Sequence, residues 1–261
     1  AEIFAAPGQV SEVHLNIREG ARKRSKFHAE NASYGKLYYY QGPMENLVRE
    51  MPEANLLMMQ HLGKSDTYDF GKKPLDLLKE YKQNEAAKIE KAREAVLNSP
   101  LGNATKAYLD AHISMQQMTS LLEAPNLLTG KYAMANREME REAFSAYYMS
   151  LFKAMPKDYI DKEMFAVLNQ PEVLMMPELG NLVGQAERIR EMSGIEEGLF
   201  TQLGATAKLY RGIKDFAPLT DAQKEEMKSL PEACQQYLMA ENDKLLVKIE
   251  ANKKKSGFRV N

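Results

Sequence analysis

The feature that most constrains the fold is helical periodicity, which runs with few interruptions from residue 42 to residue 251. Apolar residues in this range recur mostly at three- and four-residue steps, which places them on one face of a helix. Prolines and glycines divide the range into segments of helical length. The expected helices are 44–51, 53–62, 73–98, 104–123, 136–154, 158–170, 178–192, 195–214, 220–229 and 232–251. This pattern predicts a mainly α fold, an irregular multi-helix domain with roughly eight to ten helices.

Several boundaries of these helices rest on individual residues. Pro52 is expected to break or offset the helix that begins at residue 44, and Pro125 to stop the one that begins at residue 104. Thr220 and Gln223 have the spacing of a capping box, so a helix should begin there. The middle of the long helix, residues 83–91, is largely polar and is expected to face water.

The N-terminal part of the chain has a different period. Residues 3–6 and 10–17 flank the turn dipeptide Pro7-Gly8, and the second segment alternates apolar Val13, Leu15 and Ile17 with polar residues. Alternation with a period of two is typical of a half-buried strand, so these segments predict a small β-hairpin. Residues 18–36 are expected to form a loop, and residues 37–40 a short extended piece.

The domain organisation follows from these patterns. The small N-terminal hairpin is expected to be the remnant of a preceding β domain, because a lone hairpin is marginal in water. The chain therefore reads as the middle of a longer protein. The expected organisation is the hairpin and basic loop in 1–41, a helical domain in 42–252, and a linker towards a further domain in 253–261.

Composition excludes several classes of partner. With 44% hydrophobic and 27% charged residues the chain is globular, and its net charge of −1 argues against a nucleic-acid partner. Residues 18–36 are locally basic, with six Lys and Arg against two Glu, which fits either a solvated loop or contact with an anionic partner. No apolar run approaches the roughly 20 residues of a membrane-spanning helix.

The sequence nominates no catalytic, cofactor-binding or metal-binding residue, and no cofactor is expected. Cys234 is the single cysteine, so neither an intrachain disulfide nor a cysteine-based zinc site can form. Its place in a helical pattern favours a small packing residue over a reactive thiol. His14, His28, His61 and His112 show no metal-ligand spacing, and His112 is expected to be a core residue. Neither a phosphate-binding glycine loop nor a serine-hydrolase elbow is present.

The 16 methionines, with no tryptophan, leave two interpretations open. Methionine adapts to irregular helical cores, but it also forms re-packable walls of peptide-binding grooves. A deep apolar cleft lined by several of Met115, Met118, Met139 and Met149 would indicate a binding module. Burial of these side chains would indicate a scaffold.

Three stretches resemble a known family: APGQVSEVHLNIREGARKRSKFH, YRGIKDFAPLTDAQKEEMKSLPEA and EANKKKSGFRVN. Over essentially the whole chain, the sequence resembles the region upstream of the thioredoxin domain in TlpA/ResA-like thiol–disulfide oxidoreductases of the bacterial envelope. The resemblance implies a periplasmic or envelope location and a thioredoxin-like domain following this region. The Trp-Cys-x-x-Cys redox site of that domain matches no position here, so no catalytic residue is carried over.

These observations lead to one expected function and one alternative. The expected function is a non-catalytic accessory domain that positions a thiol–disulfide oxidoreductase domain or its client. Its partners are then the neighbouring thioredoxin-like domain and, as a second candidate, client proteins. The alternative is an independent helical binding module for a peptide or envelope ligand. An unrecognised hydrolase would need titratable groups that converge in a cleft.

Overall fold

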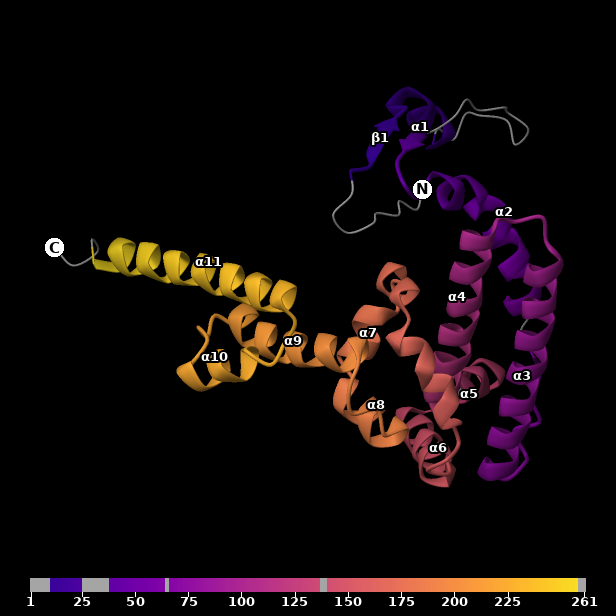
Figure 1. Ribbon diagram of the computed structural model, residues 1–261. Helices are drawn as coiled ribbons and strands as arrows, with labels where there is room; N and C mark the ends of the chain where they lie inside the picture. The colour runs from indigo at the N-terminus through magenta and orange to yellow at the C-terminus, as the bar shows by residue number, and fades with distance from the viewer. Residues whose placement is uncertain (1–9, 25–37, 64–65, 137–139, 258–261) are drawn as a thin grey trace. The chain divides into compact units, whose positions relative to one another are not determined.

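The computed structural model describes residues 10–24, 38–63, 66–136 and 140–257, which fall into two compact units divided between Pro156 and Lys157 (Figure 1). The described residues are mainly helical with a small two-stranded antiparallel hairpin near the N-terminus, so the predicted fold class is confirmed. The boundaries expected at 41/42 and 252/253 stay predictions.

The hairpin of the first unit joins β1 (Glu12–Leu15) to β2 (Tyr38–Gln41), with Val13 opposite Tyr40. Tyr40 is buried, and its hydroxyl lies 2.9 Å from Ser11 Oγ. Residues 38–40 of the segment expected to be extended belong to β2 and provide the partner strand, whereas residue 37 lies outside the described residues. The other expected partner, residues 3–6, lies outside the described residues.

The end of the first strand differs from the prediction. Leu15 and Ile17 are 64% and 80% exposed, so the alternating pattern does not mark a buried face there. The chain turns into α1 (Ile17–Arg24) instead of continuing as a strand. The side chain of Asn16 accepts a hydrogen bond from the Glu19 amide, which caps this helix. The loop expected over 18–36 is thus wrong for its first seven residues, and the remainder lies outside the described residues.

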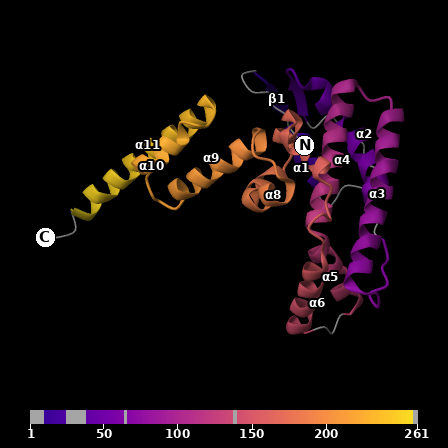
Figure 2. The ribbon, with the colours of Figure 1, turned by 60° about the horizontal axis from the view of Figure 1, so that its bottom comes forward.

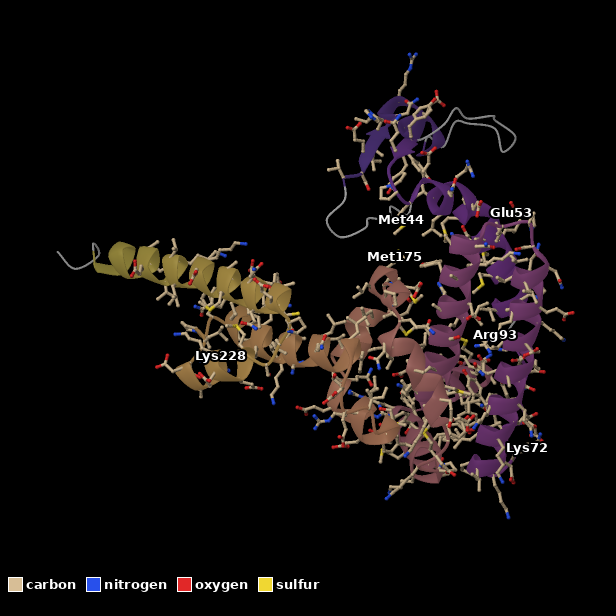
Figure 3. The ribbon with its side chains drawn as sticks, viewed as in Figure 1. Met44, Glu53, Lys72, Arg93, Met175 and Lys228 are labelled. Carbon is tan, nitrogen blue, oxygen red and sulfur yellow. The ribbon has the colours of Figure 1, made fainter. Side chains whose placement is uncertain are left out.

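Helices α2, α3 and α4 lie side by side in the first unit and form its core (Figures 1 and 2). The helices of this unit are α2 (Glu45–Leu62), α3 (Pro74–Asn98), α4 (Asn103–Leu122), α5 (Ala124–Ala135) and α6 (Arg141–Ala154). Arg93 reaches from α3 to α4, where it donates a 2.8 Å hydrogen bond to Ser114 Oγ (Figure 3). Buried side chains fill the space between the three helices, including Leu47, Met51, Ala54, Leu77, Leu78, Ile89, Ile113, Met115, Met118 and Leu121.

One predicted helix stop is wrong, and a second proline has a role that the sequence pattern did not predict. Pro52 lies inside the continuous helix α2 on its exposed face. The missing amide hydrogen costs one backbone hydrogen bond, but burial of Met51, Ala54 and Met58 holds the helix together. Helix α4 ends at Leu122, just before Pro125, as predicted. Pro125 itself occupies the first turn of α5, where a proline needs no amide partner, so it also starts a helix that the sequence pattern did not predict.

Helix α6 also departs from the prediction. It begins at Arg141, because Asn136 is the C-terminal cap of α5. Of its broad apolar face only Leu151 is fully buried, while Phe144 and Phe152 are 41% and 42% exposed. Met139, expected on the same face, lies outside the described residues.

The second unit is built from shorter elements. They are the 3₁₀ segments η1 (Lys162–Asn169) and η2 (Pro171–Met175), then α7 (Leu179–Val183), α8 (Ala186–Ser193), α9 (Leu199–Lys214), α10 (Asp221–Met227) and α11 (Glu232–Gly257). The single helix expected over 178–192 is divided in two near Gly184, and the helix expected over 158–170 is a 3₁₀ segment. The capping box of Thr220 and Gln223 is confirmed. Helix α11 continues past residue 252 to Gly257.

A glycine fixes the start of α9. Gly198 has φ +129°, and a Cβ there would lie 2.5 Å from Asn169 Oδ1. The same oxygen accepts a 3.2 Å hydrogen bond from the Phe200 amide at the first turn of α9. Only a residue without a side chain allows this approach, so Gly198 and Asn169 together tie η1 to α9.

The α9, α10 and α11 helices pack around one apolar cluster. It is formed by Leu209, Ile213, Leu219, Met227, Leu230, Leu238 and Leu245. Asn242 is the buried polar residue among them, at 2% exposure, and its Oδ1 accepts a 2.8 Å hydrogen bond from the Leu219 amide. A buried amide of this kind is stabilising only because its backbone partner is satisfied.

Candidate functional site

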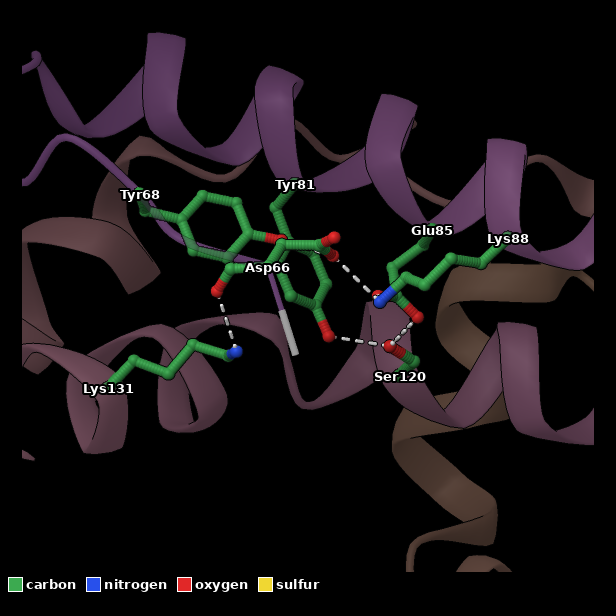
Figure 4. A network of polar contacts seen from close by, with 7 residues as sticks. All are labelled: Asp66, Tyr68, Tyr81, Glu85, Lys88, Ser120 and Lys131. Atoms are coloured by element: carbon green, nitrogen blue, oxygen red, sulfur yellow. Dashed lines mark hydrogen bonds and ion pairs between the residues drawn. The ribbon is translucent and has the colours of Figure 1, made fainter. Parts of the chain in front are cut away.

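The densest set of partly buried charged and hydroxyl groups lies in the first unit, where α3, α4, α5 and the segment before α3 meet (Figure 4). Helix α3 contributes Tyr81, Glu85 and Lys88, which follow one another at four- and three-residue steps and so share a face. The other members come from the preceding segment, α4 and α5: Asp66, Tyr68, Ser120 and Lys131. We call this set the α3 polar network.

Its centre is an ion pair between Lys88 and two carboxylates. Lys88 Nζ lies 2.8 Å from Asp66 Oδ2 and also contacts Glu85 Oε1 on its own helix. The side chains of Lys88, Glu85 and Asp66 are 18%, 13% and 28% exposed. The ammonium group therefore joins the segment before α3 to the middle of α3 in a largely water-shielded place.

A chain of hydroxyl groups connects this ion pair to α4. Ser120 Oγ donates a 2.8 Å hydrogen bond to Glu85 Oε2, and it lies 2.6 Å from the Tyr81 hydroxyl. Since Tyr81 is buried at 2% exposure, these bonds satisfy polar atoms that would otherwise lose their water partners. The hydroxyl chain thereby fastens α3 to α4.

Tyr68 and Lys131 complete the network on the α5 side. The Tyr68 hydroxyl donates to Asp66 Oδ2 at 3.3 Å. Lys131 Nζ donates to the Asp66 backbone carbonyl at 3.2 Å, and it also lies 5.4 Å from the centroid of the Tyr68 ring. The segment between α2 and α3 is thus held from both sides, by Lys88 and by Lys131.

The surroundings of Lys88, Tyr68 and Tyr81 shift the pKa values of these three groups. Burial lowers the pKa of Lys88, but the hydrogen bonds to Asp66 and Glu85 outweigh burial, so its pKa is raised overall. Burial raises the pKa of Tyr68 and Tyr81 above the ordinary value for a phenol. At neutral pH the lysine is therefore charged and the two phenols are neutral. A general base or nucleophile made from lysine or tyrosine requires the opposite shifts.

Aromatic rings extend from the network towards α6. Tyr68 lies 5.9 Å from Tyr81 and 6.4 Å from Phe70 between ring centroids, and Phe70 meets Tyr132 edge-on at 5.4 Å. Tyr132 is stacked on Tyr147 at 4.0 Å. The Tyr147 hydroxyl is buried with no hydrogen-bond partner within the described part of the chain. Contacts between these rings connect α5 and α6 to the segment that carries Asp66, and they place apolar groups beside that segment.

Outside the network, the carboxylate of Glu50 caps a helix. Glu50 on α2 accepts a 2.9 Å hydrogen bond from the Gly102 amide and a 2.6 Å bond from Thr105 Oγ1, so it caps the N-terminus of α4. These two bonds, that from Thr105 first, lower the pKa of Glu50 despite its burial. A residue on one helix thus supplies the cap that the sequence around α4 lacks.

The residues singled out from sequence are dispersed. Cys234 is half-buried and packs against the apolar cluster of the second unit, as a small packing residue would. His14 is exposed, 3.5 Å from Glu12, and half-buried His112 meets the ring of buried Tyr108 at 6.0 Å. His61 is half-buried, and His28 lies outside the described residues.

Across residues 10–24, 38–63, 66–136 and 140–257, no group of three or more His, Cys, Asp or Glu side chains is arranged to hold a metal ion. None of the helices within these ranges combines the length and the apolar character required to cross a bilayer.

Sequence reasoning missed the α3 polar network. It predicted that the polar residues of 83–91 face water, which is wrong for Glu85 and Lys88. The helical spacing of these residues could have indicated the network, because Tyr81, Glu85 and Lys88 fall on the same face of the helix as buried Leu77 and Leu78. Charged residues on an apolar face need partners, but the partners Asp66 and Ser120 lie far away in the sequence and could not be named.

No family model, curated protein or solved structure matches this chain.

Proposed function

We propose that this chain is a non-catalytic accessory domain of an envelope thiol–disulfide oxidoreductase, which positions the redox domain or its client. The observation that carries the proposal is the partly buried ion pair of Lys88 with Asp66 and Glu85, which links the segment before α3 to the middle of α3. The raised pKa values of Lys88, Tyr68 and Tyr81 keep the lysine charged and the two phenols neutral at neutral pH, as a structural clamp requires.

The way the clamp joins elements supports a scaffold role. Hydrogen bonds and ion pairs of the α3 polar network connect α3, α4, α5 and the segment before α3. Removing one partner of such a group leaves another charge or hydroxyl uncompensated, so the arrangement is rigid. A rigid support suits a domain that sets the distance and orientation of a neighbour.

The methionines support the same interpretation in part. Met115 and Met118 on α4 are 1% and 0% exposed, so they are core residues and do not line an open cleft. Met149 on α6 is 42% exposed, and Met139 lies outside the described residues. Buried methionines were the expected sign of a scaffold.

The redox and envelope parts of the proposal rest on the resemblance of the three stretches quoted above. The resemblance implies a thioredoxin-like partner domain, client proteins and a periplasmic or envelope location. The chain itself has one cysteine, Cys234, whereas a dithiol oxidoreductase needs a second thiol to resolve the mixed disulfide.

The test compares this chain with the full-length product of its gene in dithiothreitol-linked insulin reduction. The chain alone should not exceed the dithiothreitol background, and Cys234→Ser should change nothing. The full-length protein should reduce insulin. Activity of the chain alone, or a full-length protein without a Cys-x-x-Cys domain, would remove the proposal.

A second measurement addresses the scaffold role itself. In the full-length protein, Lys88→Met should loosen the clamp and lower kcat/KM for a folded disulfide client, while kcat/KM for a small disulfide such as oxidised glutathione stays unchanged. Equal losses for both substrates would mean that the helical part does not select or position the client.

An independent helical binding module remains the second candidate. It is favoured by one specific observation, a cavity in the second unit.

A further inference from the structure

The C-terminal end of α9 and the middle of α11 line a partly open cavity of about 200 Å³. Ile213 and Leu245, which are 6% and 5% exposed, supply apolar lining from the cluster that holds these helices together. Tyr210 adds an aromatic wall, and its ring lies 5.5 Å from that of Tyr237. The cavity therefore offers an apolar place for a small group.

Three lysines surround this apolar lining: Lys214, Lys244 and Lys248. Lys244 is paired with Glu241 at 2.6 Å. Glu241 also lines the cavity, but within the described ranges no ion pair shorter than 4.0 Å joins Lys214 or Lys248 to a carboxylate, so these two lysines are open to an anionic ligand. Lys214 lies in the last turn of α9, where its positive charge interacts favourably with the helix dipole. Lys248 lies in the interior of α11, where the dipole does not stabilise its charge in this way.

Phe216 is the unusual member of the cavity wall. Its φ of +63° is left-handed, and among the described residues it is the one non-glycine with positive φ. The Phe216 amide bonds to Ile213 O and the Ala217 amide to Gly212 O, which is the hydrogen-bond pattern of a Schellman cap. The position after the helix cap in this motif is ordinarily glycine, because a side chain is sterically disfavoured in the left-handed region.

Burial of the Phe216 ring does not offset this backbone strain in the free protein, because the residue is 72% exposed. A strained backbone that holds a large apolar side chain in water, against a cavity, is the arrangement expected where the side chain meets a ligand. Stability alone would favour glycine here.

We propose that this cavity is a binding site for a small organic monocarboxylate whose apolar part is a single ring or a short acyl chain. The apolar part enters between Tyr210 and Leu245, and Phe216 closes over it. The carboxylate meets Lys214 and Lys248. A cavity of this size suits one ring, since an engineered apolar cavity of about 150 Å³ takes up benzene. The proposal does not depend on the accessory role proposed above.

Phenylacetate is the probe, and phenylacetamide is its uncharged counterpart of nearly the same shape. Titration of the isotope-labelled protein, followed by amide chemical shifts, should give a dissociation constant on the order of 1 mM for phenylacetate, as expected for a ligand of this size. The shifts should concentrate on residues 210–217 and 241–248. Phenylacetamide should bind about tenfold more weakly, because it cannot pair with the lysines.

Three variants test the named residues. Lys214→Gln combined with Lys248→Gln should weaken phenylacetate binding about tenfold and leave phenylacetamide binding unchanged. Phe216→Gly should weaken both ligands while it raises the melting temperature by about 2 to 4 °C, since the backbone strain is relieved. Lys208→Gln is the matched control, because Lys208 lies on α9 but pairs with Glu187 outside the cavity.

The opposed effects of Phe216→Gly separate binding from folding, because a damaged fold would lose both stability and affinity. Three outcomes would overturn the proposal: no saturable shift with phenylacetate, equal affinity for phenylacetamide, or wild-type affinity in Phe216→Gly.

Discussion

Replacing Lys88 by methionine tests whether the α3 polar network is a clamp. The variant keeps the length and most of the apolar volume of the side chain but removes the ammonium group between Asp66 and Glu85. Loss of one partner from a fully buried ion pair costs about 3 to 5 kcal/mol, whereas an exposed pair contributes about 0 to 1 kcal/mol. The three side chains are 13% to 28% exposed, which places them between these limits.

We therefore expect Lys88→Met to lower the free energy of unfolding by about 2 to 3 kcal/mol, which corresponds to a melting temperature about 5 to 10 °C lower. Urea unfolding followed by far-ultraviolet circular dichroism measures the change as a shift of midpoint at constant slope. Lys91→Met is the matched control, because Lys91 lies on the exposed face of the same helix and should change stability by less than about 0.5 kcal/mol.

The pH dependence gives a second signature of the same clamp. Because the pKa of Lys88 is raised in the folded protein, its contribution is complete below the ordinary lysine value of 10.5 and is lost as the pH rises through the raised value. The stabilities of the wild type and of Lys88→Met should converge at high pH. If Lys88→Met behaved like Lys91→Met at neutral pH, the reasoning from burial and pairing would be refuted.

Three further variants test the contacts that fix individual helices, each measured by thermal and urea unfolding. Glu50→Gln should lower the free energy of unfolding by about 1 to 2 kcal/mol above pH 4.5, and this loss should vanish as the pH falls through the lowered pKa of Glu50. Glu53→Gln is the control, because Glu53 is exposed on the same helix, and it should have no effect (Figure 3). Gly198→Ala should destabilise by about 2 kcal/mol because of its φ and the nearby amide oxygen, whereas Gly180→Ala, with open space around it, should be neutral or slightly stabilising; equal effects would contradict the steric argument. Asn242→Leu should cost about 2 kcal/mol by leaving a buried backbone amide without its acceptor, and an unchanged midpoint would show that this amide finds another partner.

The sequence correctly predicted the features that depend on residues close together in the chain. The capping box at Thr220 and Gln223 is present because both partners lie within four residues. The long helix expected over 73–98 is found as Pro74–Asn98, since its apolar residues recur at helical steps and Pro74 suits its first turn. The prediction failed at Pro52, where packing keeps the helix continuous, and it missed the helix α5 that starts at Pro125, just after the predicted end of α4.

The sequence by itself determined the mainly α class and the approximate course of the long helices, because periodicity and capping act over a few residues. Only the tertiary structure decided which polar side chains meet. Lys88 faces Asp66 across the turn before α3, Tyr81 reaches Ser120 across 39 positions, and Phe216 stands at a cavity formed with α11. The physical reason is that pairing and enclosure depend on how helices pack against each other, and residues distant in sequence share no local signal.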